Sequence, residues 1–170
     1  MGYTHYWTYR RDGDQREWAD ALSYVHRILE ARPCPLQIEY SDRLMRVNGY
    51  GPCDGGRNHC TPGTPYACSD PASAEHEDFI LYTTLAGLPP SRQWETDPAT
   101  YWDFCKTAQK SYDIPVSAIL ALVEWLAPTC ITVESDGDLS DWEPGIALAR
   151  EATGLPIEAP ASIRKAKAIA

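Results

Sequence analysis

The stretch Asp113-Ile114-Pro115-Val116-Ser117-Ala118-Ile119-Leu120-Ala121-Leu122-Val123-Glu124-Trp125-Leu126-Ala127 decides the fold of this 170-residue chain. Its residues are apolar nearly all round a helical wheel, which is the pattern of a helix buried on every side. Asp113 is a good N-cap, Pro115 is tolerated in the first turn, and Pro128 cannot continue the helix. We therefore expect a central buried helix over residues 114–127, with the other elements packed around it.

Strand-like runs lie on both sides of this helix. Residues 3–9 alternate strictly, so that His5, Trp7 and Tyr9 are expected to face one side of a sheet. Further β-branched and aromatic runs predict strands at 36–40, 44–47, 78–84, 101–107 and 130–134.

Two amphipathic segments predict further helices. Asp14 and Glu17 have the spacing of a capping box before an apolar stripe that has to end ahead of Pro33. Ser140 and Glu143 have the same spacing before a last helix, which we expect to stop at Gly154. The pattern predicts an α+β two-layer sandwich, with three helices on a mixed or mostly antiparallel sheet of about six strands.

The length and composition indicate one domain over residues 1–155. Residues 48–74 are rich in Gly, Pro and Cys and predict a long loop inside it. Residues 156–170 are expected to form a poorly ordered C-terminal tail.

Charge and hydropathy narrow the classes of partner. A net charge of −9 with scattered Lys and Arg excludes sequence-independent nucleic-acid binding, which requires clustered basic residues. The opening residues show no signal peptide, and no segment is apolar enough to span a membrane. We expect a cytoplasmic protein with reduced cysteines; the sequence leaves a homo-oligomer open.

The aromatic residues are unusual in kind, with ten Tyr and six Trp against two Phe. Tyr and Trp carry a polar tip on a large apolar body, which suits half-exposed binding surfaces. The alternative is a core built from Tyr and Trp in place of Phe.

Three polar stretches at the ends of apolar segments supply the candidate site. In the first, Thr4 and His5 stand in the opening strand, and His5 is either a catalytic acid or base or a packed structural residue. In the second, Lys106, Thr107, Tyr112 and Asp113 surround a helix N-terminus, where a phosphate-bearing, nucleotide-like ligand would bind. The alternative is that Asp113 only caps the helix while Lys106 reaches solvent.

The third stretch, Ser135-Asp136-Gly137-Asp138, places carboxylates between a strand and a helix. Such groups could hold a divalent cation or act as a general base. A tight turn that uses Gly and Asp for its own geometry is the alternative. Whether the three stretches meet in space is not visible in the sequence.

The long loop contains potential zinc ligands. Thiolates and imidazoles are the ligands zinc prefers, but the chain has no Cys-x-x-Cys pair. We expect no cofactor, and keep zinc as a minor alternative with the ligands Cys53, His59, Cys60 and Cys68.

Several motifs together carry a family resemblance: Gly2-Tyr3-Thr4-His5-Tyr6-Trp7, Phe104-Cys105-Lys106-Thr107-Ala108 with Tyr112-Asp113, and Ser135-Asp136-Gly137-Asp138. The chain resembles a family of small bacteriophage and bacterial proteins from residue 2 to about 150. The resemblance carries no assigned activity. It implies a phage-type accessory role, in the cytoplasm of the host cell.

These observations predict a binding protein that engages a host protein or a nucleotide-like small molecule, with counter-defence as one role. Its predicted site consists of Thr4, His5, Lys106, Thr107, Tyr112, Asp113, Ser135 and Asp136. One alternative is a metal- or carboxylate-assisted hydrolase of phosphorylated small molecules, with His5, Asp136 and Asp138 as its groups. The other is a pure protein-interaction module with a flat aromatic patch.

Overall fold

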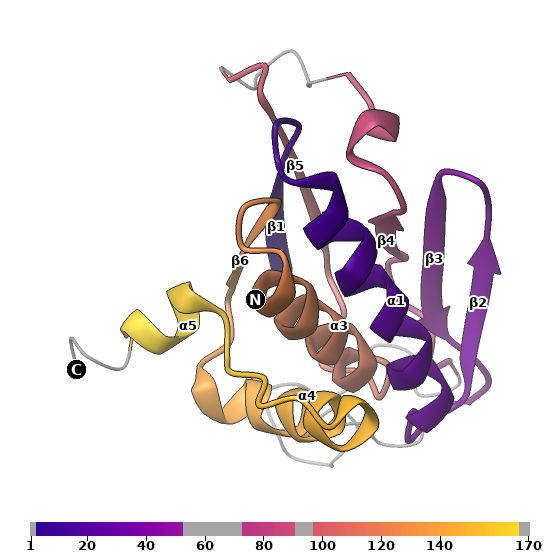
Figure 1. Ribbon diagram of the computed structural model, residues 1–170. Helices are drawn as coiled ribbons and strands as arrows, with labels where there is room; N and C mark the ends of the chain where they lie inside the picture. The colour runs from indigo at the N-terminus through magenta and orange to yellow at the C-terminus, as the bar shows by residue number, and fades with distance from the viewer. Residues whose placement is uncertain (1–2, 53–72, 91–96, 167–170) are drawn as a thin grey trace.

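Two antiparallel three-stranded sheets form the β part of the computed structural model, which describes residues 3–52, 73–90 and 97–166 (Figure 1). The first has the order β5-β1-β6, and the second the order β2-β3-β4. Their bounds are β1 (His5–Arg10), β5 (Thr100–Cys105), β6 (Ile131–Ser135), β2 (Leu36–Tyr40), β3 (Leu44–Gly49) and β4 (Phe79–Tyr82). The predicted α+β class is confirmed, although the six strands divide between two sheets instead of forming one.

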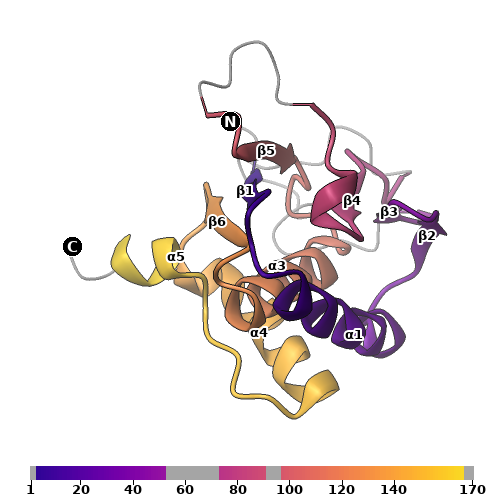
Figure 2. The same ribbon diagram turned by 45° about the horizontal axis from the view of Figure 1, so that its top comes forward.

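Helix α3 (Asp113–Leu126) lies at the centre, as its sequence predicts, and is packed against α1 (Gln15–Ala31) and α4 (Leu139–Thr153). Figures 1 and 2 show these helices together on one side of β1, β5 and β6. A single 3-10 turn (Leu85–Gly87) follows β4, and a short helix α5 (Ala161–Ala166) comes near the C-terminus. Three main helices were expected, and the described residues contain the short helix α5 in addition.

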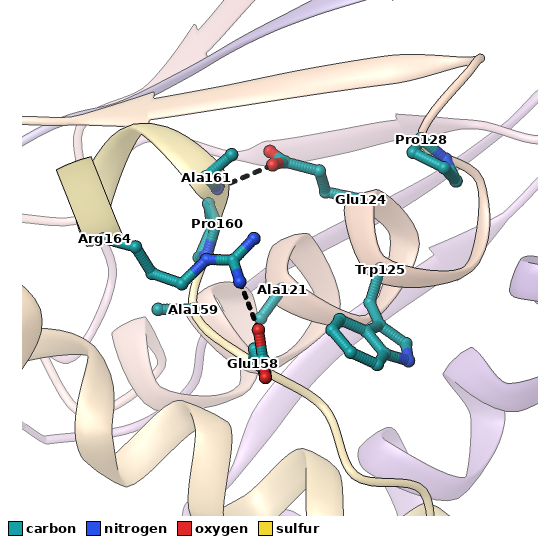
Figure 3. A pocket seen from close by; sticks show the side chains of 9 residues that line it. All are labelled: Ala121, Glu124, Trp125, Pro128, Glu158, Ala159, Pro160, Ala161 and Arg164. Atoms are coloured by element: carbon teal, nitrogen blue, oxygen red, sulfur yellow. Dashed lines mark hydrogen bonds and ion pairs between the residues drawn. The ribbon is translucent and has the colours of Figure 1, made fainter.

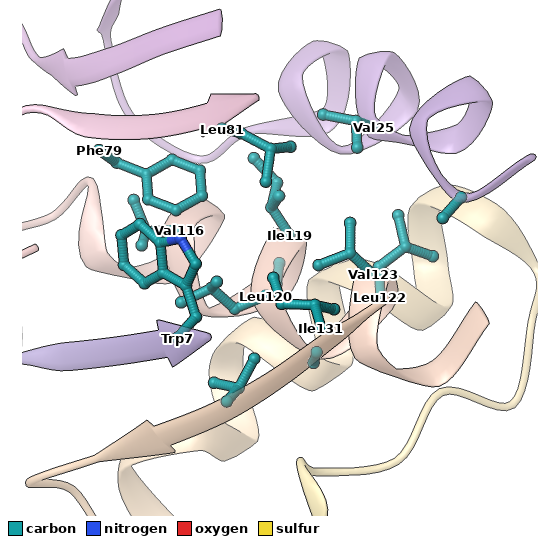
Figure 4. Close-up of a cluster of buried hydrophobic side chains, with 14 of the residues drawn as sticks. Trp7, Val25, Phe79, Leu81, Val116, Ile119, Leu120, Leu122, Val123 and Ile131 are labelled. Carbon is teal, nitrogen blue, oxygen red and sulfur yellow. The ribbon is translucent and has the colours of Figure 1, made fainter. Parts of the chain in front are cut away.

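The core joins both sheets to α3 (Figure 4). Trp7 of β1 and Phe79 of β4 meet edge to face, with their ring centroids 5.2 Å apart. Leu81 and Ile119 are buried in the same cluster, so apolar side chains of the second sheet and of α3 share one interior. Burial of each such side chain contributes about 1.5–3 kcal/mol, which makes this shared interior the main source of stability.

Two helix ends differ from the sequence prediction. Tyr112 is the N-cap of α3, and Asp113 lies inside its first turn without capping it. At α4 the capping box consists of Asp138 and Asp141, two residues ahead of the predicted pair. Asp14 caps α1 as predicted, and Gly154 ends α4 in the left-handed conformation, with φ 73°.

Residues 156–166 are packed on the domain, in contrast to the poorly ordered tail that was expected. Ile157 and Ile163 are buried in the core cluster. The Ser162 hydroxyl donates to the carbonyl of Val133 in β6 at 2.6 Å. The apolar positions of this segment are too few and too widely spaced to reveal that packing in the sequence.

No helix within the described residues combines the length and the hydrophobicity needed to cross a membrane.

Candidate functional site

The three polar stretches converge in the interior, and His5 is their meeting point. Strand pairing sets His5 opposite Cys105 on one side and opposite Ser135 on the other. The imidazole Nε2 lies 2.7 Å from Asp113 Oδ1, and Nδ1 lies 3.0 Å from Ser135 Oγ. His5 is 0% exposed and Asp113 1%, so their pair is shielded from solvent.

Asp113 collects hydrogen bonds from two elements. Its Oδ1 accepts from the Thr107 hydroxyl at 2.5 Å as well as from His5. The carboxylate also stands in the first turn of α3, where the helix dipole favours a negative charge. A buried charge is tolerable when hydrogen bonds satisfy it in this way.

Ser135 occupies the half-buried end of the network. Its Oγ accepts from the Gly137 backbone N–H at 3.0 Å and lies 3.3 Å from the Thr4 carbonyl. Asp136 donates its backbone N–H to the same carbonyl at 3.0 Å. The Ser135–Gly137 turn is therefore fastened to Thr4, the residue that precedes β1.

The loop between β5 and α3 is conformationally strained. Ala108 and Gln109 both have positive φ angles, of 53° and 57°. A non-glycine residue in this region costs of order 1–3 kcal/mol and persists only where the surroundings hold it. Two contacts do so: the Ala108 N–H donates to the Tyr3 carbonyl at 3.2 Å, and the Gln109 amide donates to Asp141 at 3.1 Å.

Two further side chains of this loop region are turned inward. The buried Lys110 ammonium donates to the carbonyl of Ser73 at 2.5 Å. The Tyr112 hydroxyl donates to the Glu77 carbonyl at 2.8 Å, and burial raises the pKa of Tyr112 well above its ordinary value. Tyr112 is thus committed to the interior, and its ring cannot serve as an open stacking surface.

The last two predicted site residues lie at the rim. Lys106 is half-buried, and its backbone N–H donates to the Glu77 carboxylate at 2.8 Å. Asp136 is exposed, and its carboxylate accepts from the Tyr6 hydroxyl at 3.3 Å. Of the predicted residues, Thr4, His5, Thr107, Tyr112 and Asp113 are buried, Ser135 is half-buried, and Lys106 and Asp136 reach the surface.

The remaining predicted residues are Asp138, from the hydrolase alternative, and the ligands of the zinc alternative. Asp138 is the N-cap of α4, and bonds from Ser140 and Asp141 lower its pKa. Within the described residues, no group of three or more His, Cys, Asp or Glu side chains is placed to hold a metal ion. The zinc ligands predicted at Cys53, His59, Cys60 and Cys68 lie outside the described residues.

A partly exposed aromatic row lies on the opposite side of β1 from this network. We call the side of the β5–β1–β6 sheet that faces away from α3 the outer face. There the ring of Tyr6 stacks on Trp102, with centroids 5.9 Å apart, and Trp102 lies 5.2 Å from Phe104. Phe104 is 39% exposed, and Tyr6 and Trp102 are half-buried. We did not predict this set as a site, although the alternation in residues 3–9 already separated Tyr6 from His5.

A small cavity, of about 170 Å³, lies between the C-terminal end of α3 and residues 158–164 (Figure 3). Trp125 and Arg164 stand at its sides, and Arg164 is paired with Glu158. Glu124 accepts backbone hydrogen bonds from Val133 at 2.7 Å and from Ala161 at 2.8 Å. This carboxylate therefore has a structural task, which is to hold β6 and α5 against α3.

Comparison with known proteins adds no relative: no family model, no curated protein and no solved structure matches the chain. The resemblance to phage and bacterial proteins stays a prediction.

Proposed function

We propose that this chain is a non-enzymatic binding protein that holds a partner protein against the outer face of the β5–β1–β6 sheet. The aromatic row of Tyr6, Trp102 and Phe104, which is partly exposed, is the observation that carries the proposal. Aromatic side chains are enriched at protein interfaces because they bury a large area with few rotatable bonds. The row is continuous across two paired strands, so it offers one rigid contact surface.

The charges beside the row favour a partner with a basic surface. Glu134 is exposed on β6 directly opposite Tyr6, and Asp136 accepts from the Tyr6 hydroxyl. The chain as a whole carries a net charge of −9. Lys and Arg side chains of a partner would gain both from these carboxylates and from the faces of the aromatic rings. A phosphate-bearing ligand would be repelled there.

The family resemblance makes a host protein the natural class of partner, with counter-defence as the corresponding role. The buried network supports binding over catalysis in a different way. His5 and Thr107 both bond to Asp113 in the interior, so this network stiffens β1 and the loop after β5 beneath the outer face. A rigid surface loses less entropy when it binds.

Two matched substitutions test the binding proposal. Trp102→Ala removes the centre of the aromatic row, whereas Trp125→Ala removes a Trp of 37% exposure at the end of α3. Affinity capture from host lysate with wild type and both variants should yield a protein retained by wild type and W125A and lost by W102A. Glu134→Lys should weaken the same capture, and added salt should reduce it. Equal capture by W102A and wild type would place the binding surface elsewhere.

A hydrolase is the second candidate, and one observation favours it. Ser135, His5 and Asp113 are hydrogen-bonded in series, which is the order of the groups in Ser-His-Asp hydrolases. In that reaction Ser135 Oγ would attack an acyl carbon and pass its proton to His5 Nδ1. His5 would return this proton to the leaving group as its bond to the acyl carbon breaks, and a water molecule would then release the acyl group from Ser135. Full burial of His5 and the bond from Gly137 to Ser135 Oγ count against it.

A fluorophosphonate probe separates the two candidates. A hydrolase of this kind becomes labelled at Ser135, and Asp113→Asn suppresses the labelling. A binding protein gives no adduct in intact-mass spectra. Native mass spectrometry of the protein from its producing cells would in addition reveal a retained nucleotide-like molecule or metal ion.

A further inference from the structure

Strand β2 forms an open edge of the second sheet. The sheet order is β2-β3-β4, and Figures 1 and 2 both show β2 on the outside of the molecule. Among the described residues, no strand pairs with the edge of β2 that faces away from β3. An open edge presents a row of backbone donors and acceptors that another strand can take up.

The pairing of β2 with β3 fixes which backbone groups face this edge. The Tyr50 N–H donates to the Pro35 carbonyl at one end of the pair, and the Ser41 N–H donates to the Leu44 carbonyl at the other. Hydrogen-bonded residues alternate along an antiparallel strand. Gln37 and Glu39 therefore bond to β3, and the intervening residues Leu36, Ile38 and Tyr40 direct their N–H and C=O groups outward.

The same three residues carry apolar side chains that the domain does not fully cover. They share the α1 side of the sheet with Met45 and Val47, which are 4% and 0% exposed. Tyr40, by contrast, is 67% exposed, and Leu36 and Ile38 are half-buried. A small apolar cavity between α1 and the sheet, of about 120 Å³, opens beside Tyr40. Helix α1 thus leaves the apolar side chains of the edge strand β2 partly uncovered.

We propose that this edge is a homodimer interface, in which β2 pairs antiparallel with β2 of a second copy about a two-fold axis at Ile38. In this register Ile38 faces Ile38 of the second copy, and Leu36 faces Tyr40. All of these residues have outward backbone groups, so each pair exchanges two hydrogen bonds. The β2-β3-β4 sheets of the two copies then form one sheet of six strands. The uncovered apolar side chains of each copy pack against those of the other.

The other face of the strand fits the same register. Gln37 comes opposite Glu39 of the second copy, where an amide can donate to a carboxylate. Arg46 of β3 already lies 3.4 Å from the Glu39 carboxylate and offsets its charge. The strand sequence Leu-Gln-Ile-Glu-Tyr contains neither Pro nor Lys, the residues that commonly guard an exposed edge. A closed two-fold pair uses up the edge and leaves none for further growth.

Sedimentation equilibrium of the wild-type chain tests the dimer. The expected mass is twice the chain mass of 19.0 kDa, falling to the single-chain value on dilution. Tyr40→Lys should shift the equilibrium to monomer, because it places a charge in the apolar contact. Tyr50→Lys, at a side chain of 62% exposure outside the edge, should leave the dimer intact.

Ile38→Pro tests the backbone pairing separately. It removes an N–H that faces outward and leaves the β2–β3 bonds in place, so the variant should fold and sediment as a monomer. Circular dichroism melts of each variant confirm folding. A wild-type protein that stays monomeric up to its solubility limit overturns the proposal, and so does a Tyr40→Lys variant that dimerises like wild type. Neither result depends on the function proposed for the outer face.

Discussion

At the scale of single residues, Asp113 holds together parts of the chain that are far apart in the sequence. Asp113→Ala leaves the His5 Nε2–H and the Thr107 hydroxyl buried without their acceptor. The free energy of unfolding should fall by about 3 kcal/mol, since each unsatisfied buried group costs roughly 1–3 kcal/mol. Asp136→Ala is the control, because an exposed substitution of this kind stays within about 0.5 kcal/mol of wild type. Urea titrations measure both, and equal values would remove the structural role assigned to Asp113.

Glu124 should make stability depend on pH. Burial raises the pKa of its carboxyl above the ordinary value, despite two backbone hydrogen bonds that lower it. A raised pKa means that the folded state binds the proton more tightly than the unfolded state. This contribution is therefore complete below the ordinary pKa and is lost as pH rises through the folded-state pKa.

Glu124→Gln should flatten that part of the pH profile, because the amide does not titrate. It should also cost about 1–3 kcal/mol, since one amide oxygen cannot replace two carboxylate oxygens toward Val133 and Ala161. Thermal melts of both proteins from mildly acidic to neutral pH provide the comparison. A wild-type profile with the same slope as the variant would contradict the role given to Glu124.

Asp113 also shows which structural features a local sequence pattern predicts and which it does not. Its position before an apolar run predicted a helix start, and α3 does start there. Its bond to His5 joins residues 108 positions apart, and no local spacing encodes such a contact. The sequence therefore identified most of the polar residues that converge, whereas their burial follows from tertiary packing alone.

At the scale of elements, α3 and α4 approach each other at Gly145. A Cβ at this position would lie 2.1 Å from Ser117 Oγ and 2.9 Å from the Ala118 backbone nitrogen. Gly145→Ala should therefore destabilise the protein by about 1–3 kcal/mol, as overpacking of a core does, even though Ala favours a helix.

Ser117→Ala in the same chain supplies the control. It removes the nearer of the two clashing atoms, so the double variant should recover part of the lost stability. Denaturant unfolding of the two single variants and the double variant gives the coupling energy. Purely additive effects would show that the helices can separate at this point.

The number of strands was predictable from β-branched and aromatic runs, but their division into two sheets was not. Within the described part of the chain, β4 pairs with β3 alone and β5 with β1 alone. A local sequence pattern predicts the hairpin of residues 36–40 and 44–49. The partner of β4, in contrast, depends on how α1 and α3 pack between the sheets. For the same reason Tyr6, Trp102 and Phe104 were recognisable as aromatic but not as one row.

At the scale of the whole molecule, the C-terminal segment closes the domain. Besides the buried Ile157 and Ile163, it supplies the carbonyl of Ile157 that accepts from the Arg150 side chain at 2.7 Å. A chain that ends at residue 155 loses these contacts, and Glu124 then keeps only one of its two backbone donors. Two buried isoleucines alone correspond to about 3–6 kcal/mol as an upper estimate.

That loss is comparable to the total stability of many domains, so the chain ending at 155 should melt far below wild type or fail to fold. A chain that ends at residue 166 keeps every one of these contacts and should melt close to wild type. Calorimetric melts of the two truncated chains beside the full chain decide the point. If the chain ending at 155 melted like wild type, residues 156–166 would contribute little to the stability of the domain. If it unfolded, these residues would be as necessary for folding as the core helix α3.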